Sequence, residues 1–286
     1  MNTETMTIGV VGSGQMGRGI AQTAAQAGCR VTLSDLNRET AQGGKDTIAQ
    51  SLDRLVAKEK ITPDQRAATL ERIHPIEALS EHGEASIVIE AATENEALKT
   101  AIFKELDAAL PPETLLATNT SSISITRLAG ATTRPGKVIG MHFMNPVPVM
   151  KLVEVIRGIA TEDATYDTTV ALAEAMGKTV VTSQDYPGFI VNRILMPMIN
   201  EAAFVLMEGV ASAKDIDAAM QLGTNQPMGP LVLADFIGLA TCLSIMEVLH
   251  EGLGDSKYRP CPLLRQRVDA GWLGRKSGRG FHSYEG

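Results

Sequence analysis

The chain has 286 residues, of which 44% are hydrophobic and 21% charged, and its formal net charge is −7. This composition is typical of a globular protein with one large domain or two unequal ones, and it excludes a disordered or fibrous chain. The acidic balance provides no positive field for a nucleic-acid backbone, so we expect no nucleic-acid partner.

Two segments bear on the cellular location. Residues Met1–Met6 contain no Lys or Arg that precedes an apolar core, so neither a secretory signal nor a transit peptide is predicted. The most apolar stretch, Leu231–Leu249, contains Asp235 and Glu247, whose cost in lipid favours a buried helix over a membrane span. We therefore expect a soluble cytoplasmic protein that does not contact a membrane.

The three cysteines, Cys29, Cys242 and Cys261, lie far apart in the chain and show no CxxC spacing. Their odd number and wide separation argue against both a disulfide framework and a zinc site. We therefore expect reduced thiols and no metal.

The first sixty residues contain one strand–helix–strand unit and a long helix. The apolar run Thr7–Val11 leads directly into glycines, helical spacing continues through Ile20–Ala27, and Arg30–Ser34 returns to strand composition. A single long helix is predicted next, from Arg38 to Lys60.

Strands and helices continue to alternate beyond this unit. We expect a strand at Ser86–Ala91, a helix at Asn95–Leu110 and a strand at Leu115–Thr118. Fully apolar strands between amphipathic helices are typical of a parallel sheet that is covered on both faces. The fold class predicted for this part is α/β, a doubly wound domain of the Rossmann type.

Two further strands, Val138–Phe143 and Lys151–Ile156, are separated by a short Pro-rich segment. That segment is too short to contain a crossover helix, so the two strands are predicted to be antiparallel neighbours. A helix near Ala164–Met176 and a strand near Thr179–Ser183 would complete the first domain.

The strand signal disappears after Pro187, and helical patterns follow at Gly188–Glu208, Ser212–Leu222 and Pro230–Leu249. We therefore expect two domains, a Rossmann-type domain over residues 1–186 and a smaller all-α domain over residues 187–286. Within the latter, Phe236–Leu249 is apolar on more than one face, which a small domain can hardly bury. A homodimer through this helical domain is the expected assembly.

A glycine pattern, GSGQMG, follows the first strand at the head of a helix. It permits a tight turn, close approach of a pyrophosphate to the backbone and close helix–sheet packing, while the helix N-terminus stabilises phosphates. The second strand leads to an aspartate eighteen residues past the last glycine, where a carboxylate binds the adenine ribose and repels a 2′-phosphate. A glycine-rich turn without a ligand is the competing interpretation. NAD is the expected cofactor, with Arg38 allowing some use of NADP, and the predicted site residues are Gly12, Gly14, Gln15, Met16, Gly17 and Asp35.

A histidine and a glutamate on the two adjoining strands are candidates for proton transfer. Glu154 alternates onto the same face as Leu152 and Ile156, and an ionised carboxylate on an apolar face needs a partner. His142 is the obvious partner, and imidazole is the side chain whose ordinary pKa suits removal of a proton from an alcohol at neutral pH. Glu154 would orient His142 and stabilise its protonated form. A structural histidine and an edge-facing glutamate remain the alternatives.

Polar residues gather where a predicted strand ends, at the rim where α/β proteins bind ligands. Asn119, Ser121 and Ser122 lie there, within reach of a nicotinamide and a substrate. Ser121 or Ser122 as the cap of a helix starting near Ile123 is an equally good interpretation. Asn192, in the first turn of the helix after Pro187, either faces solvent or donates to a substrate oxygen.

Together these segments resemble the L-3-hydroxyacyl-CoA dehydrogenases, and among them the single-function bacterial 3-hydroxybutyryl-CoA dehydrogenases. The resemblance runs essentially from end to end. It is carried by GVVGSGQMGRGIAQ, EAATENEALK, NTSSISIT, GMHFMNPVPVMKLVEVI, PGFIVNRIL and LGRKSGRGF. Met144 departs from the family pattern, where Phe is frequent, and changes the packing beside His142 without affecting the chemistry.

The resemblance implies a catalytic dyad of His142 and Glu154, supported by Ser121 and Asn192. It implies that the first long helix, predicted from Arg38 to Lys60, binds the CoA moiety through Ser51 and Lys58. A lysine at that position otherwise indicates a solvated helix face. It also implies further contacts to the nicotinamide and its ribose from Glu94, Lys99, Asn119, Ser121 and Asn145.

The implied reaction transfers a hydride between NAD(H) and C3 of a short-chain (S)-3-hydroxyacyl-CoA or 3-ketoacyl-CoA, with 3-hydroxybutyryl-CoA and acetoacetyl-CoA as the expected pair. The alternatives are a related dehydrogenase of a non-CoA hydroxy acid, such as L-gulonate or carnitine, and an NAD-binding structural protein like the crystallins. The β-hydroxyacid dehydrogenases resemble only the first unit and rely on a lysine where this chain has the histidine–glutamate pair.

Overall fold

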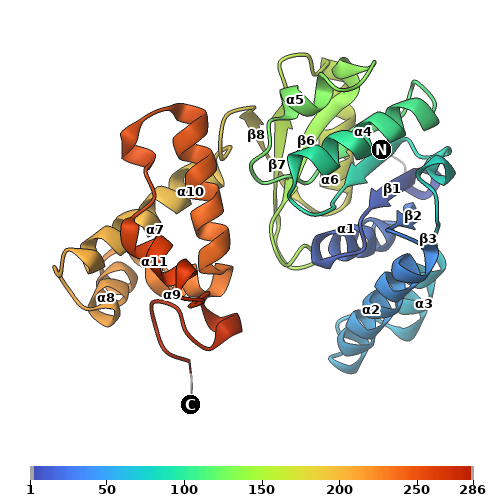
Figure 1. The fold of residues 1–286 in the computed structure, drawn as a ribbon. Coiled ribbons are helices and arrows are strands. Elements are labelled where there is room, and N and C mark those ends of the chain that lie inside the picture. Colours follow the sequence, from blue (N-terminus) through green and yellow to red (C-terminus); the bar gives the residue numbers. More distant parts are fainter. Residues whose placement is uncertain (1–2, 285–286) are drawn as a thin grey trace. The chain divides into compact units, whose positions relative to one another are not determined.

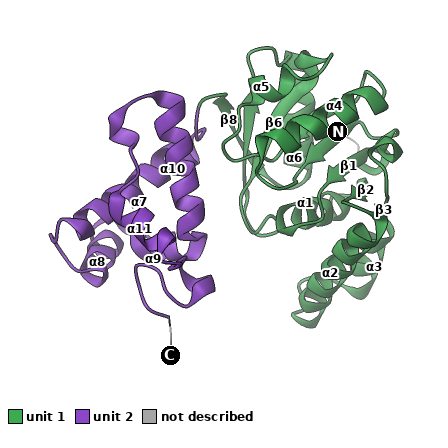
Figure 2. Ribbon diagram, viewed as in Figure 1, with its two compact units in different colours: residues 1–186 green, residues 187–286 purple. Residues whose placement is uncertain are grey.

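The computed structural model describes residues 3–284, and its elements form two compact units (Figures 1 and 2). Unit 1 comprises residues 1–186 and unit 2 comprises residues 187–286. Each unit has its own apolar core. Short 3-10 helices lie at η1 (Thr3–Thr5), η2 (Leu79–His82), η3 (Pro135–Lys137), η4 (Ser256–Tyr258) and η5 (Arg275–Ser277).

Unit 1 is built on an eight-stranded sheet in the order β3-β2-β1-β4-β5-β6-β7-β8. The strands from β3 to β6 in this order are parallel, whereas β7 is antiparallel to β6 and β8 is parallel to β7. The predicted doubly wound fold and the antiparallel extension are therefore confirmed. The strands are β1 (Thr7–Val11), β2 (Arg30–Ser34), β3 (Ile73–Pro75), β4 (Ile87–Glu90), β5 (Leu115–Thr118), β6 (Val138–Phe143), β7 (Leu152–Arg157) and β8 (Thr179–Gln184).

Helices flank this sheet, and several of them begin at a capping side chain. The Asn37 side chain accepts a hydrogen bond from the Thr40 N–H, and the Asn95 side chain accepts one from the Leu98 N–H, at the first turns of two of them. The helices of unit 1 are α1 (Gln15–Gln26), α2 (Arg38–Ala57), α3 (Pro63–Glu71), α4 (Glu96–Ala109), α5 (Ile125–Ala129) and α6 (Asp163–Ala175).

The predicted helix from Arg38 to Lys60 extends slightly beyond α2, which ends at Ala57, and the second helix that follows it was not predicted. Thr62 and Gln65 form a capping box, in which each side chain accepts from the other residue's backbone N–H, and Pro63 occupies the first helical position. This local signal for a new helix was not recognised in the sequence, and the edge strand β3 was not predicted either.

A buried histidine packs beneath β1 and β2. His82 is fully buried, with Nδ1 2.7 Å from the Thr32 hydroxyl and Nε2 2.9 Å from the Ser34 hydroxyl. Gly9 makes room for it, since a Cβ there would lie 2.8 Å from Nδ1. Burial lowers the pKa of the imidazole from 6.5 to about 4, although the Glu81 carboxylate acts in the opposite direction. The ring is therefore neutral in the folded protein at neutral pH.

This histidine should make unit 1 sensitive to acid. The unfolded chain takes up the proton near the ordinary pKa of 6.5, whereas the folded chain takes it up only near pH 4, so stability is lost as the pH falls through this window. Between about pH 7.5 and pH 5, His82 alone is expected to remove about 2 kcal/mol from the free energy of unfolding. Urea unfolding at several pH values measures it. His82→Gln should abolish this loss of stability with falling pH, whereas the control His250→Gln, at a half-buried histidine, should retain it. If the free energy of unfolding fell equally with pH in wild type and in His82→Gln, the prediction would be contradicted.

Unit 2 is helical, as predicted, and its described residues contain isolated bridges but no strand. The predicted helix Pro230–Leu249 is wrong as a single element. Gly238, with φ of +102°, separates two helices that meet at 99°. The helices of unit 2 are α7 (Val191–Met207), α8 (Ala213–Thr224), α9 (Pro230–Ile237), α10 (Leu239–Leu253) and α11 (Pro262–Asp269).

The basis on which a dimer was expected also changes. The apolar side chains of α10, including Leu239, Met246 and Leu249, belong to the core of unit 2, so this unit buries the segment that seemed too apolar for it. Within residues 3–284, no single helix is both long enough and apolar enough to cross a membrane. Only α9 and α10 taken together have the necessary length and apolarity, and a sharp bend separates them.

Candidate active site

The glycine loop between β1 and α1 has the geometry that a dinucleotide pyrophosphate requires. Gly12 has φ of +97° and approaches the end of β4, where a Cβ would lie 2.8 Å from the Ala91 carbonyl oxygen. A Cβ on Gly17 would lie 1.8 Å from the Gly12 carbonyl oxygen, so only glycine permits this packing. Gly14, in contrast, has no protein atom within 4 Å of such a Cβ. Two of the glycines therefore shape the loop, and the third leaves its outer side open to a ligand.

The head of α1 is also suited to an anion. Gly14 caps the helix without a side-chain hydrogen bond, and the first turn, with exposed Gln15 and half-buried Met16, contains no acidic residue. No acidic side chain of the helix itself therefore neutralises the partial positive charge at its N-terminus.

Asp35 follows directly after β2 and faces the glycine loop. Its Oδ2 accepts from the Ser13 backbone N–H at 2.5 Å and from the Ser13 hydroxyl at 2.7 Å, and its Oδ1 accepts from the Leu36 N–H at 2.7 Å. Burial raises the pKa of this carboxyl, but the three hydrogen bonds outweigh burial and lower the pKa below its ordinary value. Asp35 is therefore held as an anion beside the loop.

A buried ion pair lies at the carboxyl end of β4. Glu90 and Lys99 are 0% and 1% exposed, and Lys99 Nζ donates to Glu90 Oε1 at 2.7 Å and to the Ala92 carbonyl at 3.2 Å. Glu90 also accepts from the Ala92 N–H at 2.6 Å and from the Thr118 hydroxyl at 2.7 Å, which ties β4 to β5. The ion pair makes Lys99 a support for the residues around it, and its expected contact with the cofactor stays a prediction.

Glu94 gathers the loop that follows β5. Its Oε1 accepts from the hydroxyls of Thr120, Ser121 and Ser122 and from the Ser121 N–H, at 2.6–3.2 Å, while its Oε2 lies 3.5 Å from Lys99 Nζ. Burial raises the pKa of Glu94, but the charge of Lys99 and these hydrogen bonds lower it further than burial raises it. The structure thus brings three predicted site residues, Glu94, Lys99 and Ser121, into one network.

The capping interpretation of Ser121 and Ser122 is wrong. Helix α5 begins at Ile125, two residues later than expected, and Ser124 caps it by accepting from the Arg127 N–H. Thr120 meanwhile accepts from the N–H groups of Ser122 and Ile123. Ser121 therefore lies in a turn ahead of the cap.

The register between β6 and β7 places His142 directly opposite Glu154. His142 Nδ1 and Glu154 Oε2 are 2.7 Å apart, and the two residues are 8% and 0% exposed. The pairing expected from the sequence is present, because an antiparallel pair brings facing side chains on one face of the sheet close together.

Two asparagines connect neighbouring elements at the same edge of the sheet. Asn119 Oδ1 accepts from the Phe143 N–H at 2.9 Å, which joins the ends of β5 and β6. Asn145 Oδ1 accepts from Gln15 Nε2 at 3.0 Å, which joins the segment after β6 to the head of α1. Gln15, Asn119 and Asn145 therefore surround the edge that the glycine loop faces.

The remaining predicted residues lie elsewhere. Ser51 is half-buried on α2, and Lys58 is exposed at the C-cap just beyond that helix. Because seven residues make about two helical turns, both side chains lie on one side of α2. Asn192 is buried in the first turn of α7, within unit 2. The roles of these three residues remain predictions.

Four polar residues of unit 1 were missed: Ser13, Glu90, Thr118 and Thr120. Glu90 ends an otherwise apolar strand, and that position was the one sequence signal that a buried charge with a partner lay there. The hydroxyl residues gave no such signal, because their partners are distant in the chain.

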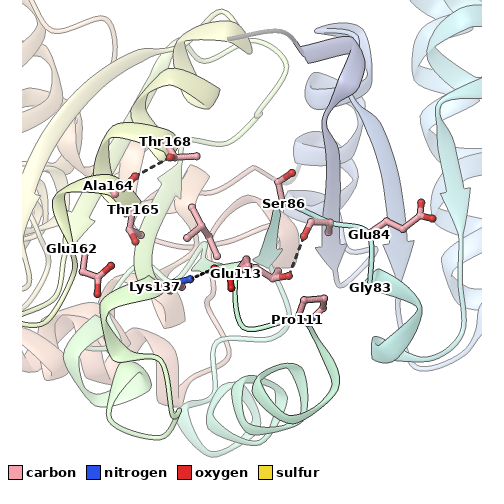
Figure 3. Close-up of a pocket in the computed structure, with 13 residues that line it drawn as sticks. Gly83, Glu84, Ser86, Pro111, Glu113, Lys137, Glu162, Ala164, Thr165 and Thr168 are labelled. Carbon is pink, nitrogen blue, oxygen red and sulfur yellow. Dashed lines mark hydrogen bonds and ion pairs between the residues drawn. The ribbon is translucent and has the colours of Figure 1, made fainter.

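A hollow of about 550 Å³ lies at the opposite, amino ends of β4, β5 and β6 (Figure 3). Its wall includes Ser86, Glu113, Lys137 and Glu162, with a 2.8 Å ion pair between Lys137 and Glu113. None of the predicted site residues lines it. Among residues 3–284 no group of three or more His, Cys, Asp or Glu side chains is arranged to hold a metal.

Family models match both units of the chain. Residues 7–186 match the 3-hydroxyacyl-CoA dehydrogenase, NAD binding domain, and residues 188–284 match the 3-hydroxyacyl-CoA dehydrogenase, C-terminal domain. The two matches together cover nearly the whole sequence, and the first identifies unit 1 as an NAD-binding domain.

Relatives agree with these models over their full lengths. The chain is 60% identical to a probable 3-hydroxybutyryl-CoA dehydrogenase of Bacillus subtilis, covering 99% of this chain and 98% of the relative. It is 57% identical to the 3-hydroxybutyryl-CoA dehydrogenase of Bradyrhizobium diazoefficiens, covering 98% and 95%. The crystal structure of (S)-3-hydroxybutyryl-CoA dehydrogenase from Ralstonia eutropha is similar with a TM-score of 0.96 and 51% identity, covering 98% and 99%. The chain therefore belongs to the 3-hydroxyacyl-CoA dehydrogenase family, as a NAD-dependent dehydrogenase.

Proposed function

We propose that the protein interconverts (S)-3-hydroxybutyryl-CoA and acetoacetyl-CoA, with His142 and Glu154 as its proton-transfer pair. The observation that carries the proposal is the 2.7 Å contact between these two buried side chains. It lies on the same side of the sheet as the glycine loop, where the parallel strands end. The names of the relatives supply the four-carbon substrate.

The residues of unit 1 fit NAD. The open side of Gly14 and the N-terminus of α1 would hold the pyrophosphate, and Asp35 would bind the adenine ribose. Asn119, Ser121 and Asn145 would meet the nicotinamide end, with Glu94 holding the loop of Ser121 in place. When bound, NAD supplies the hydride acceptor for oxidation, and NADH supplies the donor for reduction.

His142 would move the proton in both directions. Its Nδ1–H donates to Glu154, so in the neutral ring the lone pair lies on Nε2, which is the atom that would take the proton of the 3-hydroxyl. In reduction, Nε2–H of the imidazolium would donate to the 3-keto oxygen, and the buried Glu154 carboxylate would stabilise that cation. Ser121 and Asn192 would hold the substrate oxygen, and Ser51 and Lys58 the CoA moiety.

The test is reduction of acetoacetyl-CoA, followed by loss of NADH absorbance, beside free acetoacetate, longer 3-ketoacyl-CoA thioesters and NADPH. We expect turnover with CoA thioesters and none with free acetoacetate. Turnover of free hydroxy or keto acids alone would favour a non-CoA dehydrogenase. Binding of NADH without turnover of any of them would favour a structural role.

Asp35 should determine the choice between NADH and NADPH. Asp35→Asn removes the charge that binds the ribose hydroxyls, so kcat/KM for NADH should fall about tenfold or more, while kcat/KM for NADPH rises or holds. Ser13→Ala is the matched control, because it removes one of three hydrogen bonds to Asp35 and leaves the charge. An unchanged ratio of the two values in Asp35→Asn would show that Asp35 does not discriminate.

We infer a homodimer through unit 2, and the inference rests on residues other than the apolar segment Phe236–Leu249. Ile194 on α7, Val210 after it and Leu222 on α8 are large apolar side chains that are mostly exposed and that such an interface would bury. Light scattering should give twice the 30.5 kDa mass of one chain. The cytoplasmic location expected from the sequence stays a prediction.

A further inference from the structure

A second lysine of unit 1 is buried, and the reaction described above does not use it. Lys178 follows α6 and precedes β8, and its residue is 9% exposed. Its Nζ donates to the carbonyl oxygens of Val147 and Met150, at 2.5 and 2.9 Å. Burial lowers the pKa of this ammonium below its ordinary value.

This environment is unusual for a lysine. Lys99, also buried, is paired with Glu90, whereas no carboxylate in residues 3–284 lies within ion-pair distance of Lys178. Burying an ammonium without a counter-charge costs free energy, and two neutral carbonyls compensate for it only in part. Such a group is a poor way to stabilise a fold, so the role of Lys178 lies in what its hydrogen bonds hold in place.

They hold the Pro-rich segment 144–150, which connects the strand of His142 to the strand of Glu154. On one side of this segment Val147 packs against α1 at Gly19, where a Cβ would lie 2.7 Å from the Val147 Cβ. On the other side Lys178 binds two of its carbonyls. Between these anchors and His142 lies Asn145, whose Oδ1 accepts from Gln15.

The two carbonyls need this donor. The Val147 carbonyl is buried with Lys178, and a buried carbonyl without a hydrogen-bond donor is unfavourable. The ammonium offers three donors on a flexible stem, so one side chain can satisfy both carbonyls at once. Loss of the ammonium would therefore release the segment at its carbonyls while its apolar contact with α1 persists.

We propose that Lys178 is a positioning residue for the cofactor site, which fixes the segment 144–150 so that Asn145 faces the nicotinamide end of bound NAD. The proposal rests on the cofactor site described above and adds a residue that does not itself touch the cofactor. A shift of about 1 Å in a binding group is enough to reduce activity by one to two orders of magnitude.

The experiment compares Lys178→Met with wild type in two separate measurements, NADH affinity by fluorescence titration and steady-state reduction of acetoacetyl-CoA. Methionine keeps most of the buried stem and removes the donors. We expect the Kd and KM for NADH to rise about tenfold, with less than about a twofold change in the KM for acetoacetyl-CoA. Lys178→Arg, which retains donors, should recover part of the NADH affinity.

Lys151→Met is the matched control, because Lys151 is an exposed lysine next to the same segment. It should leave NADH affinity unchanged. Thermal unfolding by circular dichroism, with titrations made well below the transition, separates folding from binding. A lower transition temperature with wild-type NADH affinity in Lys178→Met would overturn the proposal, since a purely structural role gives that result. If wild type bound NADH tightly but did not turn over acetoacetyl-CoA, the proposed substrate would be wrong. The role of Lys178 would then be decided by the NADH affinities of wild type and Lys178→Met.

Discussion

Replacing His142 by Gln is expected to reduce kcat for acetoacetyl-CoA reduction by about 10³-fold, because it removes the group that donates and accepts the proton. Glutamine is close to histidine in size and keeps a polar amide facing Glu154, so the sheet edge keeps its shape. The Kd for NADH should change by less than about twofold, since general acid–base catalysis contributes to the transition state and not to cofactor binding. Stopped-flow single-turnover kinetics and NADH titration measure the two quantities separately.

Glu154→Gln is the companion variant. It keeps the shape of the side chain and removes the charge that stabilises the imidazolium, so its kcat should lie between those of wild type and His142→Gln. Equal losses of NADH affinity and kcat in His142→Gln would refute the assigned role, because they would show that the residue supports the site as a whole.

Replacing Lys99 by Met is expected to destabilise unit 1 by about 3–5 kcal/mol, the usual cost of leaving a buried charge without its partner. Glu90 is fully buried, and without the ammonium it keeps only the Ala92 N–H and the Thr118 hydroxyl as donors. The loss is measured by urea unfolding followed by circular dichroism. The single tryptophan, Trp272, lies in unit 2, so its fluorescence reports that unit, whose transition should move less.

Two variants sharpen this test. Lys104→Met removes an exposed lysine from the same helix and should cost less than about 0.5 kcal/mol. Adding Glu90→Gln to Lys99→Met removes the buried anion as well and should recover part of the stability. If Lys99→Met were no worse than Lys104→Met, Lys99 would not support the fold, and its expected direct contact with the cofactor would become the better explanation.

Much of unit 1 was predictable because its signals are local. Apolar runs such as Ile8–Val11 and the alternation of strands with amphipathic helices indicate a parallel sheet, and the glycines after β1 indicate a dinucleotide loop. The errors were also local in origin. Thr62 and Pro63 start a helix that was not predicted, although both are local start signals, and Gly238 divides a run whose apolar composition resembled one helix.

The candidate site was predictable only in part. The position of Glu154 on an apolar face required a partner, and a short connection to the strand of His142 made the two strands neighbours, so the pair followed from the sequence. The support beneath the site did not. Lys99 and Lys178 lie in sequence contexts typical of exposed helix and loop positions, and nothing local indicates that either is buried.

By itself the sequence determined the alternation of most strands and helices in unit 1, the glycine loop with Asp35, and the residues that place the chain in its family. The sequence also indicated that His142 and Glu154 are partners on neighbouring strands. The tertiary structure alone decided their exact register, the enclosure of Lys99 with Glu90 and the anchoring of segment 144–150 by Lys178. The physical reason is that periodicity and capping act within a few residues, whereas burial and hydrogen-bond partners depend on segments that meet only when the sheet assembles.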